Sequence, residues 1–392
     1  MKIVLKPKRD ESLRRRHPWI FSGAIAAGDG APALGETVDV YSAEHEWLAR
    51  AAWSPHSQIR ARVWTFAEQE IIDSSFFHLR LERALSSRRH YDDDETTAVR
   101  LVNSESDGLP GLIVDRYADW LVCQFLSAGA ELWKPVIIDH LANLWPTQGI
   151  YERSDAPSRQ KEGLKPLTGC LAGSPPPELI QVHEHGLKLN VDIKRGHKTG
   201  LYLDQRENRQ ALAPFCRDSD VLNCFAYTGG FGLWALRGGA AHITNVDSSE
   251  EALLLAEKNA HLNGFASSIE TIRGDVFQIL RRFREEKRRP TVVILDPPKF
   301  AENIGQIQRA SRGYKDINML AMQILKPGGI LFTFSCSGHI APPLFQKIVA
   351  DAAVDADREV QIIRQLSQAA DHPVKTSFPE GLYLKGLICR VG

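Results

Sequence analysis

Cysteine is scarce in this sequence. Six cysteines occur among 392 residues, and no two of them form a Cys-x-x-Cys pair. A disulfide framework or a zinc site built from thiolates needs cysteines at closer, paired spacing. The histidines also lack a metal-ligand spacing, namely His17, His183, His185 and His197. No metal site is therefore predicted.

Long hydrophobic runs and an excess of one charge are lacking too. No apolar stretch approaches the ~20 residues that span a bilayer. Residues 1–9 have no apolar core typical of a signal peptide, so a cytoplasmic protein without membrane contact is expected. Lys and Arg number 48, as do Asp and Glu. Basic clusters in residues 1–19 and 281–289 are compatible with phosphate contacts or with solvated surface.

Short strands at close spacing are present in the first part of the chain. Candidates rich in β-branched and aromatic residues are 19–25, 37–41, 47–53 and 59–64. This spacing predicts a small barrel within residues 1–75.

Helices and strands are mixed in the next part. Helices are expected over about 74–89 and 132–144, and strands over 99–102, 112–117 and 120–126. Glycines and prolines within Ser154–Pro177 predict a loop or linker. Residues 76–182 are therefore expected to form a small α+β domain ending in that linker.

Strands and helices alternate after Asp204, which predicts a doubly wound α/β domain over residues 183–392. A glycine-rich turn, Ala226–Gly232, joins a strand at 220–225 to a helix. Glycine allows positive φ and close backbone approach, and the helix N-terminus suits a carboxylate or phosphate. The turn lacks the G-x-G-x-x-G spacing of dinucleotide-binding folds, which disfavours a nicotinamide-dependent oxidoreductase.

Acids follow the next two strands. Asp247 ends the strand at 242–247, and Asp275 follows the strand at 268–274. In an open α/β sheet such acids can accept hydrogen bonds from ribose hydroxyls or an adenine amine. Each acid alone could equally cap a helix.

An acid and a thiol follow two later apolar runs. Asp296 comes directly after 292–295, and Cys336 comes just after 331–334. Fully buried runs of this kind are typical of parallel strands, whose carboxyl ends border the ligand crevice. The alternative for Cys336 is an inert buried cysteine, which is the interpretation for Cys123, Cys224 and Cys389 within apolar runs. Cys170 and Cys216 have no motif around them.

These motifs together resemble those of the class I S-adenosylmethionine-dependent methyltransferases. The closer resemblance is to the bacterial ribosomal RNA large-subunit methyltransferase I family, which makes 5-methylcytosine in 23S rRNA. The segments that carry it are Lys198–Arg209, Asn223–Gly232, Asp296–Phe300 and Ser335–Gly338, while Arg16–Gly23 resembles the start of that family's PUA domain.

The resemblance implies the architecture and the partners. An N-terminal PUA-like, RNA-binding barrel and the small α+β domain would precede a class I methyltransferase domain with a mostly parallel seven-stranded sheet. The cofactor would be S-adenosyl-L-methionine and the partner 23S ribosomal RNA. A homodimer is left open.

The resemblance also implies the site residues. Cofactor contacts are expected from Asp204, Gln205, Arg206, Asn223, Phe225, Tyr227, Thr228, Gly229, Gly230, Asp247, Ser248, Asp275, Val276 and Asp296. Substrate contacts are expected from Pro297, Pro298 and Lys299. Two alternatives stay open: Asp204 could cap a helix, and the aromatic residues Tyr227 and Phe231 could belong to the core or to a cofactor pocket.

The expected chemistry is methylation of cytosine C5. C5 is a poor nucleophile until a thiolate adds at C6, and this assigns Cys336 as the nucleophile. Asp296 would stabilise the charge shift at N3 and N4. Because a free cysteine has a pKa near 8.5, a cationic neighbour such as Lys299 would help to form the thiolate. The runner-up is nitrogen methylation of an RNA guanine or adenine, and a third alternative is a non-catalytic RNA-binding protein.

Overall fold

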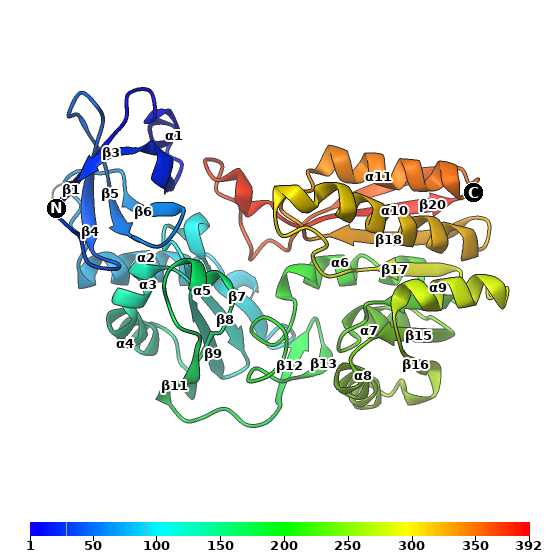
Figure 1. Ribbon diagram of the computed structural model, residues 1–392. Coiled ribbons are helices and arrows are strands. Elements are labelled where there is room, and N and C mark those ends of the chain that lie inside the picture. Colours follow the sequence, from blue (N-terminus) through cyan, green and yellow to red (C-terminus); the bar gives the residue numbers. More distant parts are fainter. Residues whose placement is uncertain (29, 92) are drawn as a thin grey trace. The chain divides into compact units, whose positions relative to one another are not determined.

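The computed structural model describes residues 1–28, 30–91 and 93–392. The chain forms two compact units, drawn in Figure 1. The first unit comprises Met1–Gly186, Val191–Leu203 and Ala370–Gly381, and the second comprises Leu187–Asn190, Asp204–Ala369 and Leu382–Gly392.

The first unit begins with a six-stranded sheet in the order β2-β6-β5-β4-β1-β3. Its strands are β1 (Lys2–Leu5), β2 (Trp19–Phe21), β3 (Ile25–Gly28), β4 (Thr37–Tyr41), β5 (Trp47–Trp53) and β6 (Ile59–Thr65), and a short helix α1 (Glu11–Arg14) follows β1. Alternate residues of β4 are buried, as a strand with one face on a core requires. The predicted barrel strand at 19–25 is wrong in its length, because a 3₁₀ turn, η1 (Ser22–Ala24), separates β2 from β3.

A second sheet of this unit has five strands in the order β11-β10-β9-β8-β7. The strands are β7 (Ala98–Asn103), β8 (Leu112–Tyr117), β9 (Trp120–Phe125), β10 (Gly149–Ser154) and β11 (Leu167–Gly173); the helices are α2 (Ser74–Ser86), α3 (Ala128–Leu132), α4 (Lys134–Leu144) and α5 (Ser158–Lys161), with a 3₁₀ turn η3 (Ser104–Asp107) after β7. Helix α2 begins at its cap, where Asp73 accepts a hydrogen bond from the Phe76 amide at 3.0 Å. It ends three residues before the expected Arg89.

The loop predicted at Ser154–Pro177 is wrong. This stretch contains α5 and the edge strand β11, which pairs antiparallel with β10 along Leu167–Gly173. Gly169 and Gly173 within β11 adopt φ of 156° and 68°. Glycine adopts such φ values readily, and within a strand it often marks a bulge or bend rather than ending the strand.

The second unit is built on a seven-stranded sheet in the order β16-β15-β14-β17-β18-β20-β19. Its strands are β14 (Asp220–Cys224), β15 (His242–Asp247), β16 (Ile269–Arg273), β17 (Val292–Leu295), β18 (Gly329–Ser335), β19 (Val360–Leu366) and β20 (Lys385–Val391). The strands β12 (Ile180–Glu184) and β13 (Leu187–Val191) precede them in the chain. Only β20 runs antiparallel to its neighbours, so the expected mostly parallel sheet is confirmed.

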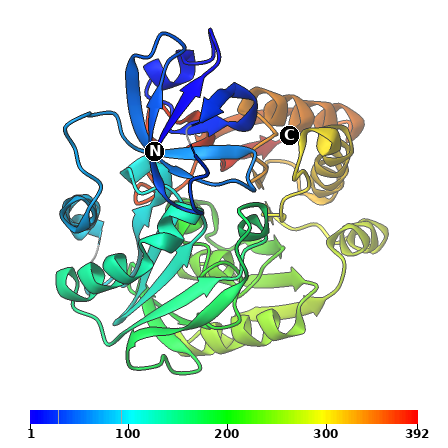
Figure 2. The ribbon, with the colours of Figure 1, turned by 60° about the vertical axis from the view of Figure 1, so that its left-hand side comes forward.

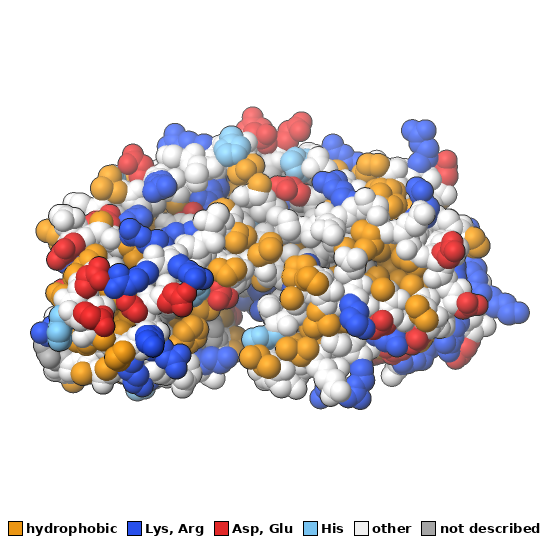
Figure 3. Space-filling view, turned by 90° about the horizontal axis from the view of Figure 1, so that it is seen from above, with side chains coloured by type: hydrophobic (Ala, Val, Ile, Leu, Met, Phe, Trp, Pro, Cys, Tyr) orange, Lys and Arg blue, Asp and Glu red, His pale blue; other side chains and the backbone are white. Residues whose placement is uncertain are grey.

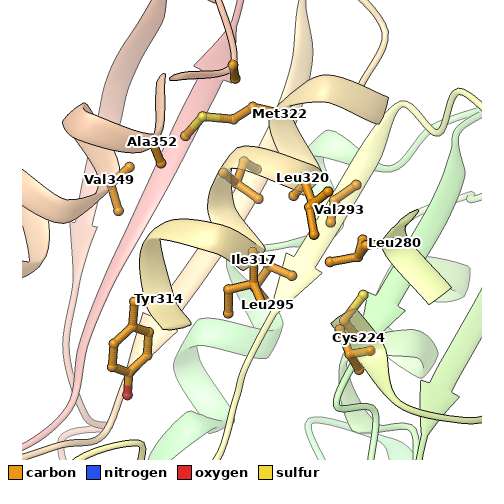
Figure 4. Packing of buried hydrophobic residues seen from close by; sticks show 14 of the residues in the cluster. Cys224, Leu280, Val293, Leu295, Tyr314, Ile317, Leu320, Met322, Val349 and Ala352 are labelled. Atoms are coloured by element: carbon orange, nitrogen blue, oxygen red, sulfur yellow. The ribbon is translucent and has the colours of Figure 1, made fainter. Parts of the chain in front are cut away.

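Helices cover both faces of this sheet (Figures 1 and 2). They are α6 (Arg206–Gln210), α7 (Gly230–Arg237), α8 (Glu250–Leu262), α9 (Val276–Glu285), α10 (Ile307–Ile324) and α11 (Pro342–Asp355). Strand β17 shows how the two cores form, because Val293 and Leu295 pack with α9, α10 and α11 (Figure 4) while Val292 and Ile294 pack with α7. All four residues are buried, so β17 reads as a continuous apolar run. The sheet order reverses between β14 and β17, and ligands bind at such a switch point.

Candidate active site

The turn after β14 has an unusual backbone. Phe225, Tyr227 and Gly229 all have positive φ, at 59°, 48° and 80°. A β-carbon at Gly229 would lie 2.9 Å from the β-carbon of Ala256, so the position excludes any side chain. Helix α7 begins at Gly230 and has no side chain capping its first N–H groups. The predicted turn and open helix N-terminus are therefore present.

Asp247 ties this turn to the end of β15. Its Oδ2 accepts from the Tyr227 amide at 2.8 Å, and its Oδ1 accepts from the Ser249 amide at 3.0 Å. Each carboxylate oxygen has two lone pairs, so both can accept a further hydrogen bond. Asp247 is partly exposed and Ser248 is exposed, so both lie at the surface of the strand ends.

Asp275 is the N-cap of α9, with its Oδ1 accepting from the Gln278 amide at 3.1 Å. Asp275 therefore caps the helix, which was the alternative interpretation of this acid. Its side chain is also exposed, so it can still meet a ligand. Val276 is buried in the core, so only its backbone can meet a ligand. Phe231 is buried against Phe334 in the core on the α7 face, with ring centroids 5.4 Å apart, whereas Tyr227 is partly exposed.

Asn223 lies within β14 rather than at its end. The side chain is buried and its Nδ2 donates to Oδ1 of Asn245 on β15 at 2.8 Å. Thr228, in the turn, is also buried, and its carbonyl accepts from Asn259 Nδ2 at 3.2 Å. Both residues therefore stabilise the end of β14 and its turn through buried hydrogen bonds, and their side chains are not exposed to a ligand.

The segment that begins at Asp204 is mostly buried. Asp204 does not cap α6, because the N-cap residue is Gln205 and no side chain forms a capping bond there. Asp204 Oδ2 instead accepts from the Tyr383 hydroxyl at 2.7 Å, and its Oδ1 is buried with no hydrogen-bond partner among the residues that the structure describes. A buried carboxylate oxygen without a donor indicates room for a cationic or N–H-bearing ligand. Arg206, two residues further along the chain, is also buried.

Asp296 follows β17 and faces this segment. Its Oδ1 accepts from Gln205 Nε2 at 2.9 Å, and Gln205 Oε1 accepts from Asn208 Nδ2 at 2.6 Å. Burial of the carboxyl group, followed by the charge of Asp204, raises the pKa of Asp296 to about 7. At neutral pH this carboxyl therefore exchanges readily between its acid and its base form.

Cys336 lies where β18 ends. Its Sγ is 3.9 Å from the carbonyl oxygen of Pro297, so the thiol lies beside the residue that follows Asp296. The side chain is partly exposed, whereas burial raises the pKa values of the fully buried thiols of Cys123 and Cys224. Cys389 is buried too, as predicted. Cys336 thus differs from the inert core cysteines.

The turn that carries Cys336 is held by several bonds to Ser337. The Ser337 Oγ lies 3.1 Å from the Tyr314 hydroxyl and accepts from the Ala301 amide at 3.3 Å. The Ser337 carbonyl accepts from Lys385 Nζ at 2.7 Å. Lys385 is buried, which lowers its pKa to about 8 while the charge of Cys336 acts in the opposite direction.

Lys385 and Tyr383 are site residues that the sequence analysis missed. Both come from the segment leading into β20, which pairs Lys385 with Ser335 of β18. The signal in the sequence is a single lysine at the start of an otherwise apolar run, Leu384–Cys389. Lys299, the cation proposed from the sequence, is exposed, as is Pro298, whereas Pro297 is buried.

No group of three or more metal-ligating side chains occurs among the described residues. Within the same residues, no helix has both the length and the hydrophobicity needed to cross a membrane.

The chain is similar to known proteins over its whole length. Residues 3–66 match a PUA-like domain family, and residues 161–376 match a family described as S-adenosylmethionine-dependent methyltransferases. Curated relatives named "Ribosomal RNA large subunit methyltransferase I" include those of Aliivibrio fischeri (strain MJ11; 55% identical, 99% of both chains) and Aeromonas salmonicida (strain A449; 55% identical, 99% of this chain and 98% of the relative). A solved structure of a candidate SAM-dependent methyltransferase from Streptococcus mutans is 21% identical and aligns over 100% of both chains with a TM-score of 0.86, which shows a shared fold.

Proposed function

The chain belongs to the S-adenosylmethionine-dependent methyltransferases and, within them, to the ribosomal RNA large subunit methyltransferase I family, and from this premise we propose that it methylates C5 of a cytosine in 23S rRNA. One observation supports this chemistry: the partly exposed thiol of Cys336 has its Sγ 3.9 Å from the carbonyl oxygen of Pro297. Pro297 directly follows Asp296, so the thiol and the acid lie close together. Nitrogen methylation needs no nucleophilic thiol at this place.

The cofactor is S-adenosyl-L-methionine, and the strand-end residues fit it. The open N-terminus of α7 and the carboxylates of Asp247 and Asp275 suit the adenosine part, and the unpartnered Oδ1 of Asp204 suits the cationic amino acid part. When bound, this cofactor supplies an electrophilic methyl group. The residues of this chain bind it, exclude water and present the base.

The proposed reaction begins with the thiolate of Cys336. Its sulfur forms a bond to C6 of the cytosine, and the electron pair of the C5–C6 double bond moves to C5, which takes the methyl group. Asp296 in its acid form donates a hydrogen bond or proton at N3 while this charge shift occurs. The C5 proton then passes to a water molecule, the double bond re-forms as the C6–sulfur bond breaks, and the proton at N3 returns to Asp296, so that both the thiolate and the acid are regenerated.

Lys385 is the cation that we assign to the thiolate in place of Lys299. It donates to the carbonyl of Ser337, the residue after Cys336, and it is buried, so its charge is poorly screened. Lys385 acts as a positioning residue because it holds the turn that presents the thiol.

Trapping tests the covalent step. RNA that carries 5-fluorocytosine cannot lose its C5 substituent as a proton, so the wild-type protein should remain attached to it through Cys336. The Cys336→Ala variant should form no adduct and transfer no methyl group, while its affinity for S-adenosylhomocysteine stays within about twofold of wild type.

A matched variant is Cys170→Ala, which removes an exposed cysteine of β11 in the first unit. It should form the adduct as the wild type does. Methyl transfer that persists in Cys336→Ala would overturn the mechanism and favour methylation of a ring or amine nitrogen.

A further inference from the structure

A cavity of about 430 Å³ lies in the first unit, among α2, η3 and the segment that contains Lys375. Its lining holds four basic side chains and one carboxylate: Arg80, Arg83, Arg88, Lys375 and Asp107. The protein as a whole has no net charge, and Figure 3 shows basic and acidic side chains interspersed over the visible face. The lining of this cavity therefore carries an excess of positive charge.

Two of the four cations are already neutralised by acids. Arg88 is buried and binds Asp107 through two bonds of 2.8 Å each. Arg80 binds Glu70, with Nη2 2.9 Å from Oε2. These two arginines form a fixed wall, because their geometry is held by charge-assisted bonds.

The other two cations, Arg83 and Lys375, form no ion pair with any residue in the described part of the chain. Lys375 is partly buried, and its backbone amide donates to Ser106 Oγ at 3.3 Å. Burial and then the charges of Arg80, Arg83 and Arg16 lower the pKa of Lys375. Positive charges that raise each other's energy in this way are stabilised when an anion enters between them.

We propose that this cavity binds a phosphate group of the RNA backbone. Arginine binds phosphate oxygens through paired N–H groups and lysine through a compact charge, and the cavity offers one unpaired residue of each kind. Arg83 is exposed, so a polymer can reach it. The inference rests on the proposed function for its ligand, and a free phosphate ion is the other source of the same chemistry.

The test compares two glutamine variants with a matched control. Arg83→Gln and Lys375→Gln remove the unpaired cations, while Arg89→Gln removes an exposed arginine that follows α2 but does not line the cavity. Affinity for a 23S rRNA fragment is measured between 50 and 200 mM salt. The double variant Arg83→Gln/Lys375→Gln should bind roughly tenfold more weakly, and its salt dependence should fall by about one unit of slope, as expected when one phosphate contact is lost. Arg89→Gln should stay within about twofold of wild type.

Two further measurements separate the outcomes. Calorimetric titration with inorganic phosphate tests the other source: tight phosphate binding that the double variant loses, together with unchanged RNA affinity, would overturn the RNA proposal. Adduct formation with 5-fluorocytosine RNA at saturating concentration should be normal in the double variant, because the cavity and Cys336 serve different steps. If the phosphate proposal is wrong, the protein still forms the adduct. If the proposed cytosine chemistry is wrong, no adduct forms, but the RNA affinities of the variants can still be compared. Thermal unfolding shows whether the double variant is folded. If it is unstable, the RNA affinity of the single variant Arg83→Gln, at an exposed position, is measured in its place.

Discussion

The two units bury carboxylates in opposite ways. In the first unit, Asp115 is fully buried and binds Arg100 through bonds of 2.8 and 3.0 Å. In the second unit, burial and then the nearby charge of Asp204 raise the pKa of Asp296 to about 7. A buried acid that has its cation remains charged and rigid, whereas a buried acid beside another acid changes its protonation near neutral pH. The first arrangement supports structure, and the second can transfer a proton.

Of these two kinds of acid, the titrating one should have the larger effect on the reaction when it is removed. In Asp296→Asn the amide oxygen can still accept the bond from Gln205, but the side chain cannot exchange a proton with the base. We expect methyl transfer to slow by about 100- to 10,000-fold, the range of a general acid–base contribution, with RNA affinity retained. Single-turnover transfer of labelled methyl groups measures this. The surface variant Asp351→Asn should leave the rate unchanged, and a rate for Asp296→Asn within tenfold of wild type would contradict the assigned role.

Removing a paired acid should instead affect stability. Asp115→Asn leaves the guanidinium of Arg100 without its carboxylate in a buried place, so the free energy of unfolding should fall by about 3–5 kcal/mol. Urea denaturation followed by circular dichroism measures the loss. Asp94→Asn, at an exposed acid of the same unit, provides the control. A loss below 1 kcal/mol would mean that the buried pair contributes little to this unit.

The smallest expected effect is on the pH dependence of the free energy of unfolding, which should differ between the two kinds of acid. The pKa of Asp296 rises from 3.8 to about 7 on folding, so the folded protein holds a proton between these values that the unfolded chain has released. Its free energy of unfolding therefore falls as pH rises from about 4 to about 7. Asp296→Asn lacks this titration, and we expect it to gain about 1–3 kcal/mol over wild type at pH 8, with the gain lost near pH 4.

Thermal unfolding of both proteins across this pH range measures the difference. A constant gap between Asp296→Asn and wild type from pH 4 to pH 8 would show that Asp296 does not titrate on folding. Buffers of equal ionic strength keep surface charge effects the same in both proteins.

Much of the second unit could be predicted because its signals are local. The buried strands β17 and β18 are largely apolar runs that can be recognised in the sequence, and Asp296 and Cys336 follow them directly. The family resemblance supplied the roles of these residues, which no pattern alone establishes. The buried state of Cys123, Cys224 and Cys389 was predictable for the same reason as the strands.

The misses come from contacts between distant residues. The edge strand β11 contains Gly169 and Gly173, which locally favour a turn, and it is a strand because β10 pairs with it. Lys385 and Tyr383 are far in sequence from Ser337 and Asp204, which they bind only after β20 has been placed. The basic cavity likewise combines α2 with Lys375, nearly three hundred residues away.

The place of β20 has a consequence for synthesis of the protein. This strand follows β19 in the chain, yet it lies between β18 and β19 in the sheet. A growing chain that has reached β19 cannot pair these two strands, so it exposes the unpaired edge of β18 until β20 enters. Lys385 arrives with β20, and the turn of Cys336 lacks its anchor before that moment. We therefore expect a chain that has not yet placed β20 to hold the turn of Cys336 less firmly than the folded protein does.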